Sequence, residues 1–129
     1  MFHYTVESDK SISRTIELLT KSFQEDEFGV LWQFNLKDKL QAKGLEFDQD
    51  YYVLEVCNPF EAKRILSNNK VAGYFLPCKV VVYEDQGKTK IGLPKPTSLI
   101  DLVDDSELVE IAKDVEERLI KCINSVNKQ

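Results

Sequence analysis

The end of the chain carries one uninterrupted apolar stripe. Its members recur every three or four residues, which is the spacing of one face of an α-helix: Leu108, Ile111, Ala112, Val115, Leu119, Cys122, Ile123 and Val126. Asp104, followed three residues later by Glu107, predicts a capping box at the start of this helix. An apolar face of this length needs an apolar surface to lie on, so the rest of the chain must supply one.

Alternating apolar and polar residues predict the strands that supply this surface. The segments are "FHYTVE", "FGVLWQFN", "YYVLEVC", "CKVVVYED" and "KTKIGLP". The short connection "DQGK" predicts that the last two form a hairpin. The most aromatic strand face, which we expect to lie in the core, comprises Phe28, Val30, Trp32 and Phe34.

Helical patterns separate the first four strands. Ser8 is a candidate N-cap for a helix whose apolar face comprises Ile12, Ile16, Leu19 and Phe23. Asn35 predicts the start of a short helix with Leu36 and Leu40 facing inward, and a third helix follows Cys57. The order of elements predicts an α+β fold with helices packed on a mainly antiparallel sheet, in a single domain over 1–129.

Composition narrows the classes of partner. Hydrophobic residues make up 43% and charged residues 30% of the 129 residues, which is typical of a packed globular domain. The net charge of -5 disfavours nucleic acid as a partner, because the protein repels phosphate groups. No apolar run approaches the roughly 18 residues of a membrane span, and the start lacks a signal-peptide pattern, so we expect no membrane partner and a cytoplasmic protein.

The junction "VCNPFE" places Cys57 immediately before a predicted helix. Asn58 is a preferred N-cap, Pro59 suits the first helical position, and Glu61 completes a capping box, so the motif is explained as a helix start with a packed cysteine. The same geometry also supports a reactive thiol, since a helix N-terminus favours the thiolate and lowers its pKa. Glu55 lies on the same strand face as Cys57, either as a secondary functional group or as a partner of Lys79.

The second cysteine of interest, Cys78, begins a strand after Pro77. If the strands that carry Cys57 and Cys78 are neighbours, the two thiols approach each other at one end of the sheet. They would then share a soft metal ion such as zinc or copper, or form a reversible disulfide. No CxxC pair and no further Cys or His cluster supports zinc, so the absence of any cofactor is an equal alternative. The ligand-binding candidates are therefore Cys57, Cys78, Glu55 and Asn58, with the two cysteines as the metal ligands.

The remaining candidates have simpler interpretations. His3 is the only histidine and is expected to be a half-exposed strand residue; a dyad with Cys57 requires their two strands to be adjacent. Cys122 lies within the apolar stripe of the last helix and is expected to be packed. Three cysteines without an export signal argue against a disulfide framework.

Four segments together show a family resemblance: "FHYTVES", "FGVLWQFNLKDKLQAKG", "LEVCNPFEAKRIL" and "GYFLPCKVVVYE". The chain resembles, over nearly its whole length, the domain of unknown function 302 family of bacterial and archaeal proteins, most specifically at Asn58-Pro59 and Leu76-Pro77. Other branches of that family carry a glycine in place of Cys57 and an aliphatic residue in place of Cys78. The resemblance implies a fold similar to the TATA-box-binding protein, with a curved antiparallel sheet and helices on one side, and it implies a homodimer. It brings no catalytic residues, and the acidic charge does not support DNA binding.

Three functional hypotheses follow. The first is a small homodimeric protein that binds a small ligand or soft metal ion at Cys57 and Cys78. The second is a thiol-dependent enzyme in which Cys57 is the nucleophile or redox thiol and His3 or Glu55 its base. The third is a non-catalytic interaction module in which the cysteines are only packed.

Overall fold

A computed structural model describes the whole chain, residues 1–129. The predicted alternation of strands and helices is confirmed, with additional short helices. In chain order the elements are β1 (His3–Ser8), α1 (Ile12–Glu25), β2 (Gly29–Asn35), α2 (Leu36–Ala42), β3 (Tyr51–Cys57), α3 (Pro59–Asn68), the 3₁₀-helix η1 (Lys70–Phe75), β4 (Cys78–Asp85), β5 (Lys88–Pro94), α4 (Pro96–Ile100), α5 (Ser106–Ser125) and the 3₁₀-helix η2 (Val126–Lys128).

The five strands form one antiparallel sheet in the order β1-β5-β4-β3-β2. The predicted hairpin joins β4 to β5 through Gln86 and Gly87, whose φ angles are 53° and 77°. Two successive residues with positive φ give the two-residue turn that matches the twist of paired strands. This hairpin places β5 between β4 and β1, so the first strand of the chain becomes an edge strand.

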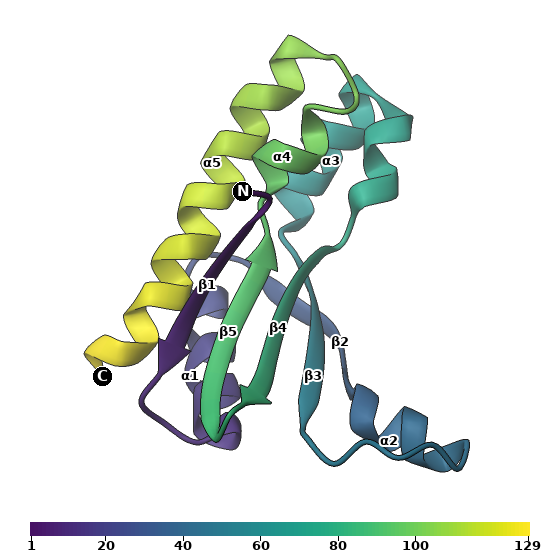
Figure 1. Cartoon of the computed structure of the whole chain (residues 1–129). Helices are drawn as coiled ribbons and strands as arrows, with labels where there is room; N and C mark the ends of the chain where they lie inside the picture. The colour runs from purple at the N-terminus through teal and green to yellow at the C-terminus, as the bar shows by residue number, and fades with distance from the viewer.

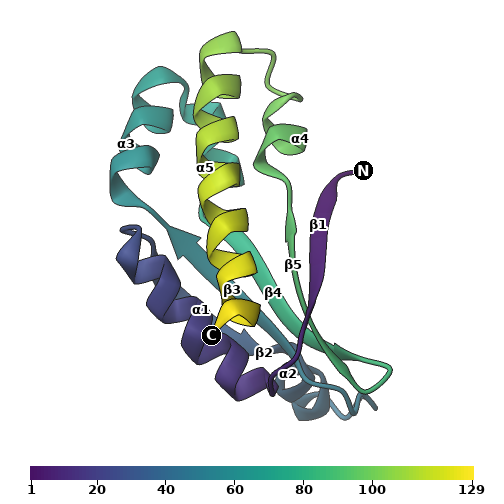
Figure 2. The ribbon, with the colours of Figure 1, turned by 90° about the vertical axis from the view of Figure 1, so that its left-hand side faces the viewer.

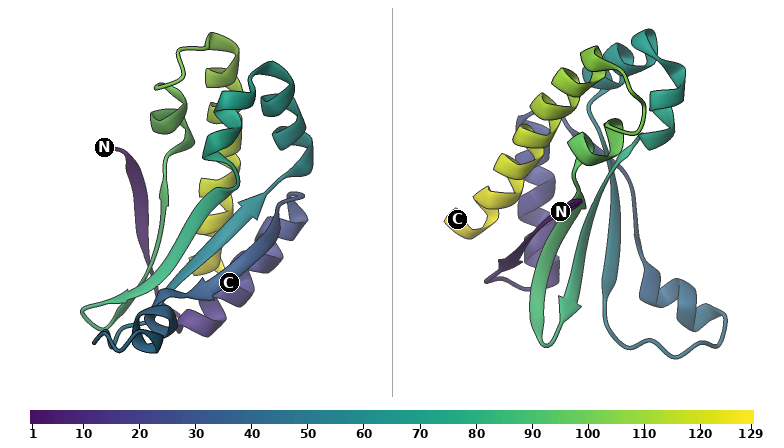
Figure 3. Two further views of the ribbon diagram at one scale, coloured as in Figure 1. Left: turned by 90° about the vertical axis from the view of Figure 1, so that its right-hand side faces the viewer. Right: turned by 45° about the horizontal axis from the view of Figure 1, so that its top comes forward.

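Helices α1 and α5 pack on one face of the curved sheet, and the opposite face carries no helix (Figures 2 and 3). The α+β architecture is therefore confirmed. The predicted stripe of α5 is buried along its whole length, from Leu108 to Ile123, and continues to Val126 in η2. It packs with the buried face of α1, which includes Leu19 and Phe23. Burial of these two apolar faces against the strands is what holds the two layers together.

The prediction of an aromatic core face on β2 was wrong at Trp32. Phe28 is buried, but Trp32 is 61% exposed, and the strand register shifts between Val30 and Trp32. The extra residue, Leu31, forms a bulge that turns the following side chains to the other face of the sheet. Trp32 then pairs with Glu55 on the face that carries no helix.

Two predicted helix caps were displaced along the chain. The N-cap of α1 is Ser11, whose side chain accepts from the Arg14 N–H, while Ser8 ends β1 and bonds to Thr15. A second displacement, of one residue, occurs at α5, where Asp105 in place of Asp104 accepts from the N–H of Glu107. In both cases several residues of capping type stand close together, and the backbone conformation selects among them.

A second group of helices extends beyond the sheet. We call α3, η1, α4 and the first half of α5 (106–115) the distal layer (Figure 1). Residues 70–75 and 96–100, for which the sequence analysis predicts no element, each form a short helix. At the opposite end α2 projects from the sheet, and the prediction that Leu36 and Leu40 face the core was wrong, since α2 has no buried residue. None of the helices has both the length and the apolar composition that a membrane crossing requires.

Candidate ligand-binding site

The two cysteines of the predicted site lie together at the distal end of β3 and β4. The strands are adjacent, and their register pairs Val56 with Cys78, so Cys57 is one position beyond that pair. Both cysteines line one small cavity of about 20 Å³. This volume is enough for a water molecule but not for an organic ligand.

Burial raises the pKa of both thiols. Cys57 is affected by burial alone, whereas the pKa of Cys78 rises to about 11 through burial, with further contributions from the negative charges of Cys57 and Glu55. The direction is opposite to the one predicted for a thiol beside a helix N-terminus. No lysine or arginine contributes to either shift, and desolvation of the thiolate is the largest cause of each. At neutral pH both groups are therefore thiols.

The donor set at the two cysteines does not fit the zinc site of the metal hypothesis. Nowhere in the chain do three or more His, Cys, Asp or Glu side chains gather in a way that could hold a metal ion. A protein zinc site uses three or four such ligands, and the metal-binding form of cysteine is the thiolate that burial disfavours here. Cys57 and Cys78 are thus neighbours without the further ligands that a zinc centre needs.

Asn58 is occupied as the N-cap of α3. Its Oδ1 accepts hydrogen bonds from the N–H groups of Phe60 (3.0 Å) and Glu61 (3.3 Å), and its Nδ2 donates to the Asp26 carbonyl at 3.5 Å. The helix-start interpretation of this junction is confirmed in this respect. Glu61 does not complete a capping box, because its carboxylate is bonded to Arg64 instead.

The two bases of the enzyme hypothesis, His3 and Glu55, have other partners in the structure. His3 is on β1, which is separated from Cys57 on β3 by β5 and β4, so the two residues are not on adjacent strands. The His3 ring is instead hydrogen bonded to Thr5, with Nδ1 and Oγ1 2.9 Å apart. The alternative interpretation of Glu55 is confirmed, since Lys79 Nζ lies 3.4 Å from its Oε1.

A larger cavity forms where the sheet splits. The pairing of β4 with β5 reaches only to Val81 and Gly92, while β4 continues beside β3 to Cys78 and β5 continues beside β1 to Pro94. Pro94 has no N–H with which to extend the β4–β5 ladder. Beyond this point the two strands diverge, as Figures 1 and 3 show, and the distal layer covers the opening.

The opening encloses a cavity of about 390 Å³ lined mainly by apolar residues. Its walls come from the ends of β4 and β5, from η1 and α4, and from the first half of α5; they include Cys78, Phe75, Leu99, Leu108, Ala112 and Val115. Glu55 and Lys79 are the only charged residues that line it. Of the four predicted ligand-binding candidates, Cys78 and Glu55 line this cavity, and Cys57 and Asn58 do not.

The cavity opens towards the uncovered face of the sheet. A shallow depression of about 450 Å³ on that face shares Lys79 and Pro94 with the cavity wall. The depression also includes His3, Thr5 and Tyr83. Lys79, which lines both the cavity and the depression and is half exposed, therefore lies at the mouth of the cavity.

The model of the family described as "Domain of unknown function DUF302" matches residues 4–126. The chain belongs to the DUF302 family. The crystal structure of an uncharacterized conserved DUF302 protein from Bacillus stearothermophilus is similar to this chain, with 53% sequence identity and a TM-score of 0.94. The similarity covers 96% of this chain and 97% of the other. None of the curated proteins matches the chain.

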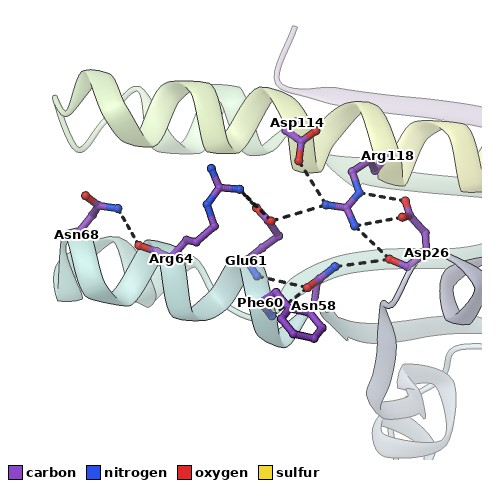
Figure 4. Close-up of polar contacts among 8 residues, drawn as sticks. All are labelled: Asp26, Asn58, Phe60, Glu61, Arg64, Asn68, Asp114 and Arg118. Atoms are coloured by element: carbon purple, nitrogen blue, oxygen red, sulfur yellow. Dashed lines mark hydrogen bonds and ion pairs between the residues drawn. The ribbon is translucent and has the colours of Figure 1, made fainter.

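In this DUF302 chain a polar network joins α5 to α3 and to the C-terminal end of α1 (Figure 4). The Arg118 guanidinium donates from Nε and Nη2 to the two carboxylate oxygens of Asp26, each at 3.1 Å, and from Nη1 to Asp114 at 3.3 Å. The same Nη1 lies 3.8 Å from Glu61, and the guanidinium is 5.1 Å from the centre of the Phe28 ring. These contacts, with Asp26 foremost, raise the pKa of Arg118. The network connects α1, α3 and α5.

Sequence reasoning missed both the large cavity and this network. Asp26 and Arg118 are 92 positions apart, and neither lies in a local motif that indicates the other. Pro94 and Pro96 in the sequence are a local signal for the split, because a residue without an N–H ends a ladder.

Proposed function

We propose that this protein binds a small, mainly apolar molecule in the cavity between β4, β5 and the distal layer. The observation that carries the proposal is the cavity itself, with about 390 Å³ of space behind a mouth at Lys79. Protein interiors are otherwise packed with few voids larger than a water molecule. Cavities of about 300 to 1,000 Å³ with apolar walls and a few polar groups are typical of small-molecule sites.

This proposal retains the ligand-binding hypothesis but places the site in the large cavity and not between the two cysteines. Cys78 and Glu55 remain in the site as wall residues, while Cys57 belongs to the small neighbouring cavity. The raised pKa of Cys78 is consistent with a thiol that packs against a bound molecule and does not attack it. Reversible binding is thus favoured over thiol catalysis.

The test uses the neutral fluorescent probe N-phenyl-1-naphthylamine, which brightens in apolar surroundings. We expect the wild-type protein to bind it with one site per chain. Ala112→Phe, which fills the cavity from α5, should abolish binding. Ala42→Phe, on the exposed face of α2, is the matched control and should bind the probe as the wild type does.

Thermal unfolding of both variants separates loss of the site from loss of the fold. If Ala112→Phe unfolds cooperatively and still binds the probe with unchanged affinity, the probe lies elsewhere and the proposal is wrong. Leu99→Trp fills the same cavity from α4 and provides a second test that does not alter α5.

We also propose that the chain forms a homodimer, as the family resemblance implies. The edge strand β2 carries Leu31 and Trp32, which are 63% and 61% exposed. Neighbouring large apolar side chains on a strand edge are unfavourable in water and are typical of a surface that a partner covers. A second copy of the chain presents the same surface and can cover it by two-fold pairing.

Light scattering of the eluted protein tests this assembly. We expect the mass of a dimer for the wild type and of a monomer for Trp32→Lys. Phe60→Lys is the control, because Phe60 is 65% exposed but is on α3. A monomeric wild type contradicts the dimer. If only the Phe60 variant is monomeric, the interface is on α3 and not on β2.

A further inference from the structure

The cavity wall is charged at a single point. Of the residues that line the cavity, only Glu55 and Lys79 carry charge, and they form one ion pair with a distance of 3.4 Å between Oε1 and Nζ. All other walls are apolar or uncharged. A bound molecule therefore meets one polar anchor and otherwise an apolar enclosure, which suits an amphiphile with its polar group at one end.

Lys79 is the member of this pair that faces the mouth. It lines both the cavity and the shallow depression on the open face of the sheet, whereas Glu55 lines only the cavity. The Lys79 side chain is 49% exposed and that of Glu55 is 23% exposed. A polar group that stays at the mouth, in contact with water, therefore meets the ammonium group of Lys79 first.

The ammonium group of Lys79 also has unused hydrogen-bonding capacity. It carries three N–H donors, and Glu55 is its one ion-pair partner. A second acceptor can bind without breaking the first contact, so Glu55 holds the lysine in place and does not block it.

We infer that the ligand is an anionic amphiphile, an alkyl carboxylate whose chain fills the cavity and whose carboxylate pairs with Lys79 at the mouth. This inference rests on the proposed function and adds the chemical class of the ligand. The chain extends from Lys79 past Cys78 towards the α5 wall at Ala112. A cationic amphiphile is disfavoured, because its head group would lie beside Lys79 and would have to compete with it for Glu55.

The experiment measures displacement of bound N-phenyl-1-naphthylamine by three molecules with the same alkyl chain. They are decanoate, decanol and decylammonium, which differ only in the charge of the head group. At low salt and neutral pH we expect decanoate to displace the probe at about fivefold lower concentration than decanol, the ratio that a partly exposed charge pair of about 1 kcal/mol provides. Decylammonium should be the weakest, and the advantage of decanoate should shrink as salt is added.

Variants of the anchor identify the residue responsible. Lys79→Met should remove the preference of the site for decanoate over decanol while probe binding persists. The double variant Glu55→Gln/Lys79→Met removes both charges, so it corrects for the unpaired Glu55 that the single variant leaves. Lys63→Met is the control, because Lys63 is an exposed lysine on α3 without an ion pair and outside the cavity wall.

The outcomes separate the inference from the proposed function. No binding of the neutral probe contradicts the proposed function itself. Normal probe binding with equal displacement by decanoate and decanol, or with decylammonium strongest, overturns the inference about the anion while the apolar site stands. A preference for decanoate that survives in both Lys79 variants also overturns the assignment to Lys79.

Discussion

The two halves of α5 present the same kind of apolar stripe to different surroundings. In the second half Leu119 and Ile123 are fully buried between the sheet and α1. In the first half Leu108, Ala112 and Val115 are also almost fully buried, yet they form a wall of the large cavity. Low exposure alone therefore does not distinguish a packed core from the lining of a binding site.

The difference arises from what each half packs against. Five paired strands offer a continuous surface that side chains can fill at high density. The distal layer offers short pieces, with η1 of six residues and α4 of five, placed over strands that have diverged. Short helices carry few side chains each, so they enclose the end of the sheet without filling it.

Removal of a large side chain from the packed half should have the largest effect. We expect Leu119→Ala to lower the free energy of unfolding by about 3 kcal/mol, because it deletes fully buried methyl groups and leaves a new cavity. The matched change in the distal layer, Leu99→Ala, should cost only about 1 kcal/mol, because Leu99 is half-buried and already borders open space. Urea unfolding measures both.

Equal losses for these two variants would falsify the distinction between the second half of α5, which is packed, and the first half, which lines the cavity. A larger loss for Leu99→Ala would reverse it and make α4 a main support of the fold. Probe binding by Leu99→Ala provides an independent readout, since a larger cavity should still bind N-phenyl-1-naphthylamine.

The polar network at the boundary of the two halves should have the next largest effect. Arg118→Met removes a guanidinium that is shared by Asp26, Asp114 and Glu61, and leaves three carboxylates without it. We expect a loss of about 2 kcal/mol, since the side chain is 26% exposed and solvent reduces the cost. Urea unfolding of Arg14→Met, an exposed ion pair on α1, should show almost no change.

Partial rescue of this variant tests the assignment to charge. Asp26→Asn in the background of Arg118→Met should recover part of the lost stability, because it removes one of the unpaired carboxylates. Additive losses in the double variant would mean that the two residues act independently, in conflict with the contacts in Figure 4.

The packed half was the more predictable from sequence, for a physical reason. Periodic patterns report which residues share a face, so the stripes of α1 and α5 and the β4–β5 hairpin were identified correctly. They do not report a local irregularity such as the bulge at Leu31, and that single residue reversed the expected position of Trp32. Caps were displaced by one or three residues where similar side chains compete.

The candidate site was only half predictable. The adjacency of Cys57 and Cys78 was stated on the condition that their strands are neighbours, which they are, and the pairing of Glu55 with Lys79 was one of the alternatives for that residue. The cavity depends on short helices with no apolar periodicity and on how two strands diverge. Pro94 is a local signal for the end of the β4–β5 ladder, but the enclosure of the opening depends on contacts between distant segments, so no pattern within one segment contains it.

The thiol at the boundary between the two cavities should make stability depend on pH. Burial raises the pKa of Cys78 from an ordinary 9.0 to about 11, so between these values the unfolded chain loses the proton and the folded chain retains it. Stability should therefore be intact below pH 9 and fall as the pH rises towards 11. We expect Cys78 to account for about 1.5 kcal/mol of this fall, less than a fully buried group would give, because the residue is half-buried.

Cys78→Ala isolates this contribution from the other groups that titrate at high pH. Urea unfolding at pH 8 and pH 10.5 should show a smaller decrease for this variant than for the wild type. A decrease of the same size in both proteins would mean that Cys78 titrates normally, and would make a reactive thiol at the cavity wall tenable again.

The smallest predicted effect concerns the contact that holds α4 against α5 beside the cavity. Helix α4 has no side-chain cap of its own, and Glu116 of α5 supplies one by accepting from the Thr97 N–H at 3.1 Å and from its hydroxyl at 2.7 Å. Glu116→Ala should cost about 1 kcal/mol or less, as loss of a helix cap usually does. Hydrogen exchange should accelerate in α4 while the strands keep their protection, because the distal layer opens locally. Thr97→Val, which keeps the N–H contact, should show about half of this acceleration. If Glu116→Ala instead accelerates exchange throughout the chain, the two halves of α5 unfold as a single cooperative unit.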